Sequence, residues 1–457
     1  MATSIALFTQ DLRLHDNPVL HAALSSADDV VPLFVLDDDL RRTGFAVPNR
    51  AAFLADCLER LDADLRQHGG RLVVRRGAPA AVAAQVVEQV GAVAVHLAAG
   101  VSSFAQRREE RLRMVLGDRL RVHEAVVTVV APGAVTPSDR DHFAIFTPYL
   151  RQWQQAERRE PLGAPRRVPV PPGVAGLPIS SVREWSAESP GGVSPGLPRG
   201  GEGEARRRLR NWLAGPLDRY AEQHDDLAGD ATSRLSPFLH FGCLSALEAT
   251  YRAGRAGGAG AEAFTRQLAW RDFHYQVLAA RPGCGRADYR PRGDRWRHAE
   301  SDVAAWRAGR TGYPLVDAGM RQLAHEGWMH NRARLLTAGF LVKTLYVDWR
   351  VGAAHFLSLL VDGDVANNQL NWQWVAGTGT DTRPNRVFNP LAQAGRFDPA
   401  GDYVRRWVPE LAGIEGAVVH QPWRLPPERR AALDYPEPMV ELEAAVRRFR
   451  TARGLEP

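Results

Sequence analysis

Residues 362–374 combine side chains that an ordinary packed helix would not bury. Two carboxylates, three asparagines, two glutamines and two tryptophans fall within these 13 positions. Asp362 and Asp364 could ligate a metal, but a hard cation needs more oxygen ligands than are evident here, so we predict no metal site. Amide groups read the edge of a heteroaromatic ring, and tryptophan offers a stacking face. The stretch therefore predicts a site for a heteroaromatic ring.

A second candidate is residues 232–237, Thr-Ser-Arg-Leu-Ser-Pro. Hydroxyls and backbone N–H groups at the start of a helix bind anions, so the segment could hold a pyrophosphate. A simple N-cap accounts for the same residues equally well. Both interpretations stay open from the sequence alone.

Residues 267–273, Gln-Leu-Ala-Trp-Arg-Asp-Phe, mix polar, cationic and aromatic groups on an expected helix. Gln267 and Arg271 are four apart and share a face. The alternative is a salt-bridged surface helix with Trp270 in the core.

Residues 328–334, Trp-Met-His-Asn-Arg-Ala-Arg, have the same character. Arg332 and Arg334 point in different directions, so one could meet a cofactor and the other a phosphate. His325 and His330 lie nearby, but they are five apart and do not share a helical face, which argues against a zinc site.

The first 130 residues must supply the framework for part of this chemistry. Short apolar runs alternate with helical patterns, which predicts a doubly wound parallel sheet. Asn49 is expected to cap a helix over residues 49–68. No GxGxxG follows the first strand, so this is not an ordinary NAD domain. The predicted strands are residues 4–8, 30–36, 71–75 and 92–97.

We expect an α/β domain over residues 1–130 and a mostly α-helical domain over residues 204–457. Residues 131–203 are the expected connector. Nine prolines fall between positions 161 and 203, which indicates a segment that crosses between domains rather than packed structure.

Composition limits the remaining function classes. The 457 residues are 45% hydrophobic and carry a net charge of +6, consistent with a polyanion partner. No long apolar run and no secretory signal are seen. Three cysteines form no CxxC pair, which fits a reducing cytoplasm. Lys343 is the only lysine among 58 cationic residues, a bias we attribute to a GC-rich genome.

Taken together, these stretches resemble the DNA photolyase/cryptochrome family. The resemblance runs from residues 11–17, Asp-Leu-Arg-Leu-His-Asp-Asn, to Pro422-Trp423, and includes Gly312-Tyr313-Pro314. The chain is most similar to class I cyclobutane pyrimidine dimer photolyases of actinobacterial type. The resemblance implies an antenna domain followed by a helical domain that holds FAD. Reduced flavin, excited by blue light, would give an electron to a thymine dimer.

The same resemblance assigns the FAD residues. Arg334 would pair with Asp362 beside the isoalloxazine, and Asn368 would face flavin N5. Arg271 would lie near the pyrophosphate. The full expected FAD set is Tyr220, Thr232, Ser233, Arg234, Leu235, Ser236, Arg271, Arg334, Asp362, Asp364 and Asn368.

Further residues are implied for electron transfer and DNA. Trp372, Trp349 and Trp296 match three tryptophans that carry an electron from the surface to oxidised flavin. The dimer pocket would comprise Gln267, Trp270, Asn331 and Trp374, and Arg332 and Gln393 would contact DNA. The expected partner is double- or single-stranded DNA containing pyrimidine dimers, bound by a monomer.

Departures from the family pattern refine the expectation. Gln267 replaces the glutamate of many dimer photolyases. A (6-4) photolyase would have histidines where this chain has Asn331 and Leu335, so that activity is not expected. Ala105-Gln106 replaces the Asn-Glu of folate-binding relatives, and Thr9 replaces a common arginine. We therefore favour an 8-hydroxy-5-deazaflavin antenna over a folate, with an empty site as the alternative.

Two rival functions stay open. A cryptochrome-like photoreceptor would use the same flavin and tryptophans, but Asn368 and the intact dimer pocket argue against it. A dark FAD-dependent redox enzyme would need a pyridine-nucleotide motif, and none is seen.

Overall fold

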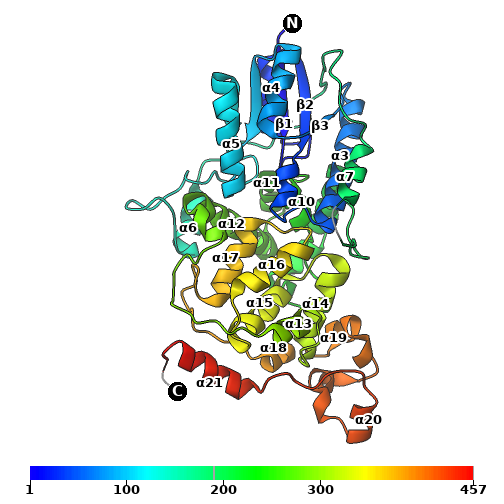
Figure 1. Cartoon of the computed structure of the whole chain (residues 1–457), viewed down its shortest axis with the longest axis vertical. Coiled ribbons are helices and arrows are strands. Elements are labelled where there is room, and N and C mark those ends of the chain that lie inside the picture. The colour runs from blue at the N-terminus through cyan, green and yellow to red at the C-terminus, as the bar shows by residue number, and fades with distance from the viewer. Residues whose placement is uncertain (189–190, 456–457) are drawn as a thin grey trace.

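The computed structural model describes residues 1–188 and 191–455 and contains an α/β domain above a helical one (Figure 1). The sheet has five strands in the order β3-β2-β1-β4-β5, and every pair is parallel. This confirms the predicted doubly wound sheet. The strands are β1 (Thr3–Phe8), β2 (Asp29–Leu36), β3 (Val73–Arg76), β4 (Ala94–Ala98) and β5 (Leu120–His123). We did not predict β5, because its four residues, Leu-Arg-Val-His, include only two apolar side chains.

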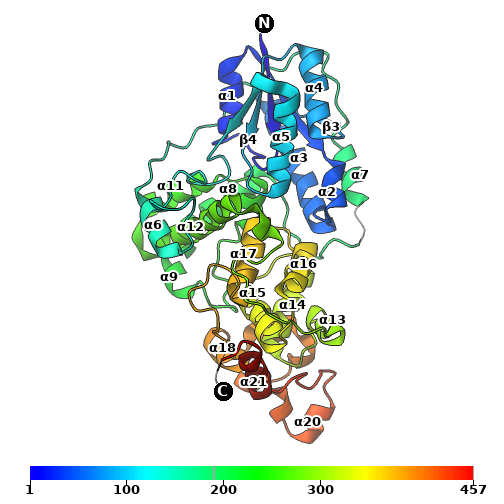
Figure 2. The ribbon, with the colours of Figure 1, turned by 60° about the vertical axis from the view of Figure 1, so that its left-hand side comes forward.

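Helices cover both faces of the sheet (Figure 2). They are α1 (Pro18–Ser26), α3 (Pro48–Gln67), α4 (Pro79–Val90) and α5 (Ser103–Leu116), with the short α2 (Asp38–Arg42) after β2. The expected cap on α3 was wrong. Val47 is the N-cap residue and Pro48 begins the helix, where the fixed φ of proline suits the first turn. Asn49 is buried instead, and its amide donates to Ser194 Oγ at 2.9 Å and to the Leu359 carbonyl at 2.6 Å.

The connector is more ordered than its proline content suggested. It contains α6 (Phe146–Gln155) and α7 (Ser181–Ala187), and α7 lies against α3 (Figure 1). Trp153 and Trp185 are buried, as are Val168 and Val182. The expectation of an unpacked connector was therefore wrong for these parts, since apolar side chains between the prolines provide a packing face. Residues 189–190 lie outside the described residues.

The second domain is helical, as predicted. Its long helices are α8 (Glu202–Leu213), α11 (Ala246–Ala256), α12 (Gly258–Ala280), α14 (Pro314–Glu326), α16 (Trp349–Leu359), α17 (Val365–Ala376) and α21 (Leu442–Ala452). The shorter ones are α9 (Tyr220–Gln223), α10 (Ser236–Phe241), α13 (Glu300–Arg307), α15 (Asn331–Gly339), α18 (Pro390–Phe397), α19 (Asp402–Trp407) and α20 (Pro427–Ala431). No helix in the described ranges is long and apolar enough to cross a membrane.

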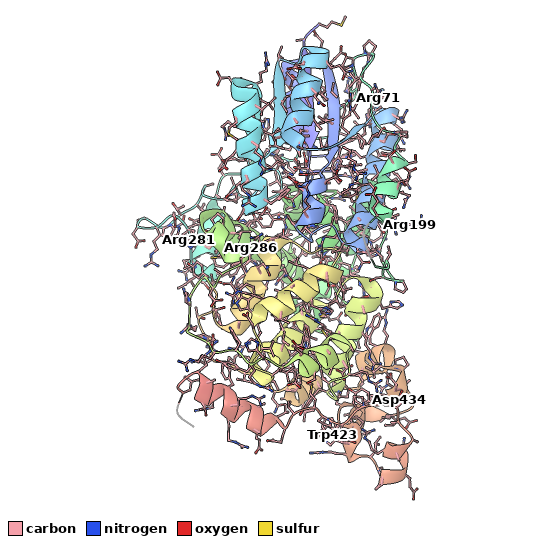
Figure 3. All side chains as sticks on the ribbon, in the orientation of Figure 1. Arg71, Arg199, Arg281, Arg286, Trp423 and Asp434 are labelled. Carbon is pink, nitrogen blue, oxygen red and sulfur yellow. The ribbon has the colours of Figure 1, made fainter. Side chains whose placement is uncertain are left out.

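Figure 3 marks the extent of the molecule: Arg71 belongs to the sheet domain, while Trp423 and Asp434 lie at the opposite end. The segment after β1 joins the two domains. Buried Arg13 donates to the carbonyls of Asp16, Val126 and Gly242. The Glu202 carboxylate accepts from the backbone N–H of Leu14 at 2.6 Å. The segment 11–17 therefore connects the two domains through buried hydrogen bonds.

Candidate functional site

An ion pair joins helix α15 to the loop before α17. Arg334 donates to Asp362 Oδ2 at 2.8 Å and to the Met329 carbonyl at 2.8 Å. The Asp362 side chain is only 3% exposed. Its second oxygen, Oδ1, is buried and has no hydrogen-bond partner among the described residues. A buried carboxylate oxygen of this kind calls for a donor from a bound group.

Asp364 links this loop to α12. Its side chain caps α17 by accepting from Asn367 N–H at 2.7 Å. The Tyr275 hydroxyl donates to its other oxygen, and burial raises the pKa of Tyr275. Arg271 donates to Tyr275 Oη at 3.2 Å and to the Val127 carbonyl at 2.6 Å. The polar groups of α12 and α17 thus form one buried network.

Asn368 and its neighbours lie on the buried side of α17. The Asn368 amide donates to the Ala353 carbonyl at 3.1 Å, and the residue is 7% exposed. Burial lowers the pKa of His274 to about 4. The neutral ring is 3.0 Å from Asn367 Oδ1 through Nδ1, which we assign as the donor because its partner is an amide oxygen. These groups are uncharged donors and acceptors, as expected for recognition of a ring edge.

The segment 232–236 precedes a helix, as expected, but none of its hydroxyl side chains caps that helix. It leads into α10, which is six residues long and has Leu235 as its N-cap without a side-chain cap. Ser236 Oγ accepts from Trp328 Nε1 at 3.1 Å. Thr232 Oγ1 is buried without a partner in the described part of the chain. Ser233 Oγ is 3.4 Å from the Leu235 N–H that donates to it.

Arg234 and Arg332 are already paired with carboxylates. Arg234 donates to Asp230 at 2.6 Å and to Glu326 at 3.2 Å. Arg332 holds Asp225 through two nitrogens, at 3.1 and 2.5 Å. Because of these pairs, neither guanidinium is free to meet a phosphate in this arrangement.

Tyr220 belongs to the same region. It is 8% exposed, and its ring meets Trp212 edge to face at 5.2 Å between centroids. Burial raises its pKa, so the hydroxyl stays protonated at neutral pH.

One of the three expected electron-transfer tryptophans, Trp372, packs closely on a glycine of α16. Trp372 on α17 is 3% exposed and meets Phe356 edge to face, with 4.9 Å between ring centroids. A Cβ at Gly352 would lie 2.2 Å from the Trp372 ring. Gly352 is one helical turn beyond Trp349, so α16 and α17 approach closely on the face that carries Trp349. The close approach at Gly352 therefore brings Trp372 against the helix that begins at Trp349.

The third tryptophan lies nearer the surface. Trp349 is fully buried and its Nε1 donates to Asp288 Oδ1 at 2.8 Å. Trp296 is half-buried, and its ring centroid is 4.9 Å from that of Tyr346. Exposure therefore rises from the interior pair to Trp296.

The expected dimer-pocket residues come from three helices. Gln267 and Trp270 are on α12, Asn331 begins α15, and Trp374 is on α17. The helix α17 packs against both α12 and α15. Gln267 and Asn331 are exposed, and both tryptophans are half-buried. Trp270 stacks on Phe146, with centroids 3.7 Å apart, which fixes its ring plane. Gln393 is half-buried on the more distant α18.

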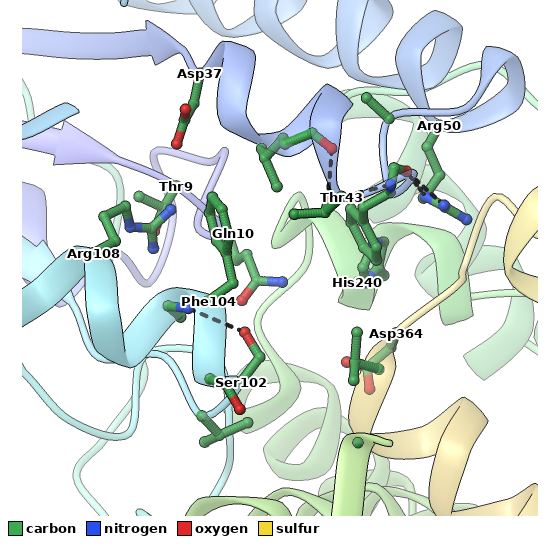
Figure 4. Close-up of a pocket in the computed structure, with 18 of the residues that line it drawn as sticks. Thr9, Gln10, Asp37, Thr43, Arg50, Ser102, Phe104, Arg108, His240 and Asp364 are labelled. Atoms are coloured by element: carbon green, nitrogen blue, oxygen red, sulfur yellow. Dashed lines mark hydrogen bonds between the residues drawn. The ribbon is translucent and has the colours of Figure 1, made fainter. Parts of the chain in front are cut away.

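A cavity of about 490 Å³ lies between the domains, at the carboxyl ends of the parallel strands (Figure 4). Strand order reverses between β1 and β4, and open α/β sheets bind ligands at such a point. The sheet domain lines it with Thr9, Gln10, Asp37 and Arg108, and the helical domain with His240 and Asp364. Arg108 Nε is buried without a partner among the described residues, and burial raises the pKa of Asp37.

Sequence reasoning missed several residues of this cavity. Asp37 directly follows β2. Because open α/β sheets bind ligands at the carboxyl ends of their strands, this position could have been predicted from the sequence. His240 carried no comparable signal; burial lowers its pKa to about 4. Arg50 was also missed. It donates to the carbonyls of Leu357 and Leu360 at 2.6 and 2.7 Å, at the end of α16, so it ties the cavity to the Asp362 loop.

Comparisons with known proteins agree with this architecture. Residues 4–170 match the family described as "DNA photolyase", and residues 264–453 match "FAD binding domain of DNA photolyase". Deoxyribodipyrimidine photo-lyase of Streptomyces griseus is 62% identical over the whole of both chains. The chain belongs to the DNA photolyase/cryptochrome family. The resemblance drawn from the motifs is thereby confirmed.

Solved structures of the family align over nearly the whole chain. A class III photolyase from Agrobacterium tumefaciens has a TM-score of 0.91 at 31% identity, with 99% and 97% of the two chains covered. An archaeal photolyase from Sulfolobus tokodaii, described with two FAD molecules, has a TM-score of 0.86 at 32% identity and covers 99% of both chains.

The helical domain fits an FAD. Asp362 Oδ1 and Thr232 Oγ1 are buried and unpartnered among the described residues. Such orphaned atoms suit the hydroxyls and ring nitrogens of a flavin nucleotide.

Proposed function

We propose that this photolyase-family protein repairs cyclobutane pyrimidine dimers in DNA, driven by light and using bound FAD. The observation that carries this proposal is the full-length identity of 62% to a deoxyribodipyrimidine photo-lyase. When bound and reduced, FAD supplies the electron that starts the opening of the dimer ring. Every other task falls to the chain's own side chains.

Four polar residues orient the flavin in this proposal. The Arg334–Asp362 pair offers a fixed charge pattern to the ring edge, supported by their 2.8 Å contact. Asn368 presents a neutral amide to flavin N5. Its amide oxygen would accept a hydrogen bond from N5–H of the reduced flavin without taking the proton. Asp364 is held by Tyr275 and Asn367, so its position is set before a cofactor binds. Arg271 and Tyr220, together with residues 232–236, would surround the phosphates and ribityl chain.

The dimer would lie between aromatic walls made by Trp270 and Trp374. A lesion extruded from the duplex needs such a slot, and a dimer costs less to extrude than an intact pair. The exposed amides of Gln267 and Asn331 would donate to its carbonyls. Arg332 and Gln393 remain proposed DNA contacts, although Arg332 must first release Asp225.

The tryptophans would form a second functional path. Trp372 and Trp349 are buried and Trp296 is half-buried, which supports Trp296 as the outer end of the proposed path. Electrons entering at Trp296 would reach the flavin region through Trp349 and Trp372. A cryptochrome-like photoreceptor would use the same path, so it is the alternative that the repair assay must separate.

We assign the inter-domain cavity to the antenna, and we favour 8-hydroxy-5-deazaflavin as its occupant. The cavity has a volume of about 490 Å³, which suits a tricyclic ring system. Ala105 and Gln106 supply no carboxylate for a pterin. Arg108, whose buried Nε has no hydrogen-bond partner among the described residues, would meet the acidic hydroxyl of a deazaflavin. The protein would act as a monomer in the cytoplasm.

The antenna assignment predicts selective reconstitution. Purified protein mixed with 8-hydroxy-5-deazaflavin should retain it through gel filtration, whereas a reduced folate should elute freely. Arg108→Met should lower deazaflavin retention about tenfold, since it removes a buried charged hydrogen bond. Absorbance of the protein peak reports the result. Retention of folate but not deazaflavin would contradict the assignment.

The repair reaction itself is the primary test. Prereduced protein should restore the absorbance of bases in an oligonucleotide containing a thymine dimer under blue light, and should leave it unchanged in the dark. An oligonucleotide with a (6-4) photoproduct serves as the specificity control and should not be repaired. Bound, photoreducible FAD without any dimer repair would instead assign the protein to the photoreceptors.

A further inference from the structure

Lys343 is the only lysine in a chain with 57 arginines. Codon bias explains an excess of arginine, but it does not explain why one position stayed lysine. The residue is 1% exposed, in the turn Phe340–Thr344 between α15 and α16. An ammonium is a compact point charge, whereas a guanidinium is planar and larger. Replacing this lysine with arginine would therefore change the shape of the cation at a buried position.

The ammonium connects two points of the backbone that are distant in sequence. Lys343 Nζ donates to the Ala376 carbonyl at 3.1 Å, at the end of α17, and to the Pro384 carbonyl. It also lies 4.6 Å from the centre of the Phe449 ring on α21. Residues 377–383 run between the two carbonyls, so Lys343 closes this segment into a loop.

The closed loop forms one side of a surface cavity of about 300 Å³. Trp374 lines this cavity together with Arg383, Arg386 and Phe388. Both arginines are exposed, and neither has a carboxylate partner within the described residues. Trp374 is a proposed wall of the dimer pocket, so the cavity adjoins that pocket. Its lining carries two arginines against the one carboxylate of Asp381, a net positive charge suited to phosphates.

The electrostatic surroundings make this buried ammonium costly to keep. Burial lowers the pKa of Lys343 to about 7, and Arg453 and Arg292 act in the same direction. Asp294 and Asp381 oppose them. Arg453 is itself paired with Asp294 and also donates to the Ala376 carbonyl, at 2.8 Å. Proteins tolerate the cost of desolvating a charged group chiefly at positions that function requires.

We propose that Lys343 is a positioning residue of the DNA site, which holds the loop 377–383 so that Trp374 and the two arginines together form one wall for the damaged strand. The proposal rests on the proposed repair function. Lys343 acts through the loop and does not touch the dimer. Binding of damaged DNA should therefore depend on Lys343, while chemistry after binding should not.

The first experiment separates binding from chemistry. Lys343→Met keeps the length of the side chain but removes its charge, and Arg119→Met removes one exposed charge from the sheet domain as a matched control. Affinity for a dimer-containing oligonucleotide should fall about tenfold in Lys343→Met if the loop, no longer held, adopts the binding arrangement in about a tenth of the molecules. The repair yield at saturating DNA and the photoreduction of FAD should match wild type. An affinity equal to that of Arg119→Met would overturn the proposal.

The second experiment uses the wild-type protein, in case Lys343→Met does not fold. Protein labelled with ¹³C at lysine Cε gives one side-chain signal, because the chain has one lysine. This signal should shift when a dimer-containing oligonucleotide is added, and should stay in place with an undamaged one. No shift upon saturation with damaged DNA would overturn the proposal. Wild-type protein that neither binds nor repairs dimers would instead remove the proposed function, a distinct outcome.

Discussion

Trp372→Phe is expected to abolish photoreduction of oxidised FAD while repair by prereduced protein stays close to wild type. Phenylalanine keeps an aromatic ring near Phe356 and loses only the far edge of the indole, which packs on Gly352, so the fold should survive at a modest cost in stability. It lacks an indole that can carry a radical cation briefly, so the path from Trp349 would end one step short of the flavin. Absorbance of oxidised FAD under illumination with a thiol donor measures the effect.

A matched control is available in the same cluster. Trp306 is fully buried, its ring centroid lies 6.1 Å from that of Trp372, and its Nε1 donates to the Thr337 carbonyl. It is not among the three proposed carriers, so Trp306→Phe should photoreduce normally. Unchanged photoreduction in Trp372→Phe, or loss only in Trp306→Phe, would show that the assigned path is wrong.

The second large effect concerns stability. Asp272→Ala should lower the free energy of unfolding by about 3 kcal/mol or more, because it leaves several buried donors without an acceptor. The carboxylate accepts from Val129 N–H at 2.8 Å, from Val130 N–H at 3.0 Å and from Trp153 Nε1 at 3.0 Å. Asp272 thereby holds the segment after β5 and helix α6 against α12, next to Trp270 and Arg271.

Urea unfolding followed by tryptophan fluorescence would measure this loss. Asp434→Ala is the control, since Asp434 is 89% exposed and its pair with Arg310 is a surface contact. That change should alter the unfolding free energy by less than about 0.5 kcal/mol. Equal midpoints for both variants would contradict the structural role given to Asp272.

The local parts of this fold could be predicted because their signals are local. Alternation of apolar strands with helical stripes indicated the parallel sheet. The polar stretch 362–374 predicted a site for a heteroaromatic ring, and that stays a prediction. Boundaries were less predictable. Pro48 rather than Asn49 begins α3, because the Asn49 amide finds partners at Ser194 and Leu359 that lie far away in the sequence. β5 was missed because it has too few residues to display a period.

The charged residues also divide into pairs that the sequence suggested and pairs that only the folded structure reveals. The resemblance suggested the Arg334–Asp362 pair, and the structure shows these two residues in contact. Nothing in the sequence indicated that Arg332 would be held by Asp225, or that Lys343 would join Ala376 to Pro384. Such partners depend on which helices the folded chain brings together.

The sequence by itself determined the family, the two kinds of domain and the residue types available for light-driven chemistry, because motifs and periodicity are properties of neighbouring positions. The tertiary structure alone decided which buried groups keep a free atom for a ligand, which arginines are already neutralised, and where the cavity between the domains opens. The physical reason is that desolvation and pairing depend on the atoms around a group, and packing supplies those atoms from distant parts of the chain.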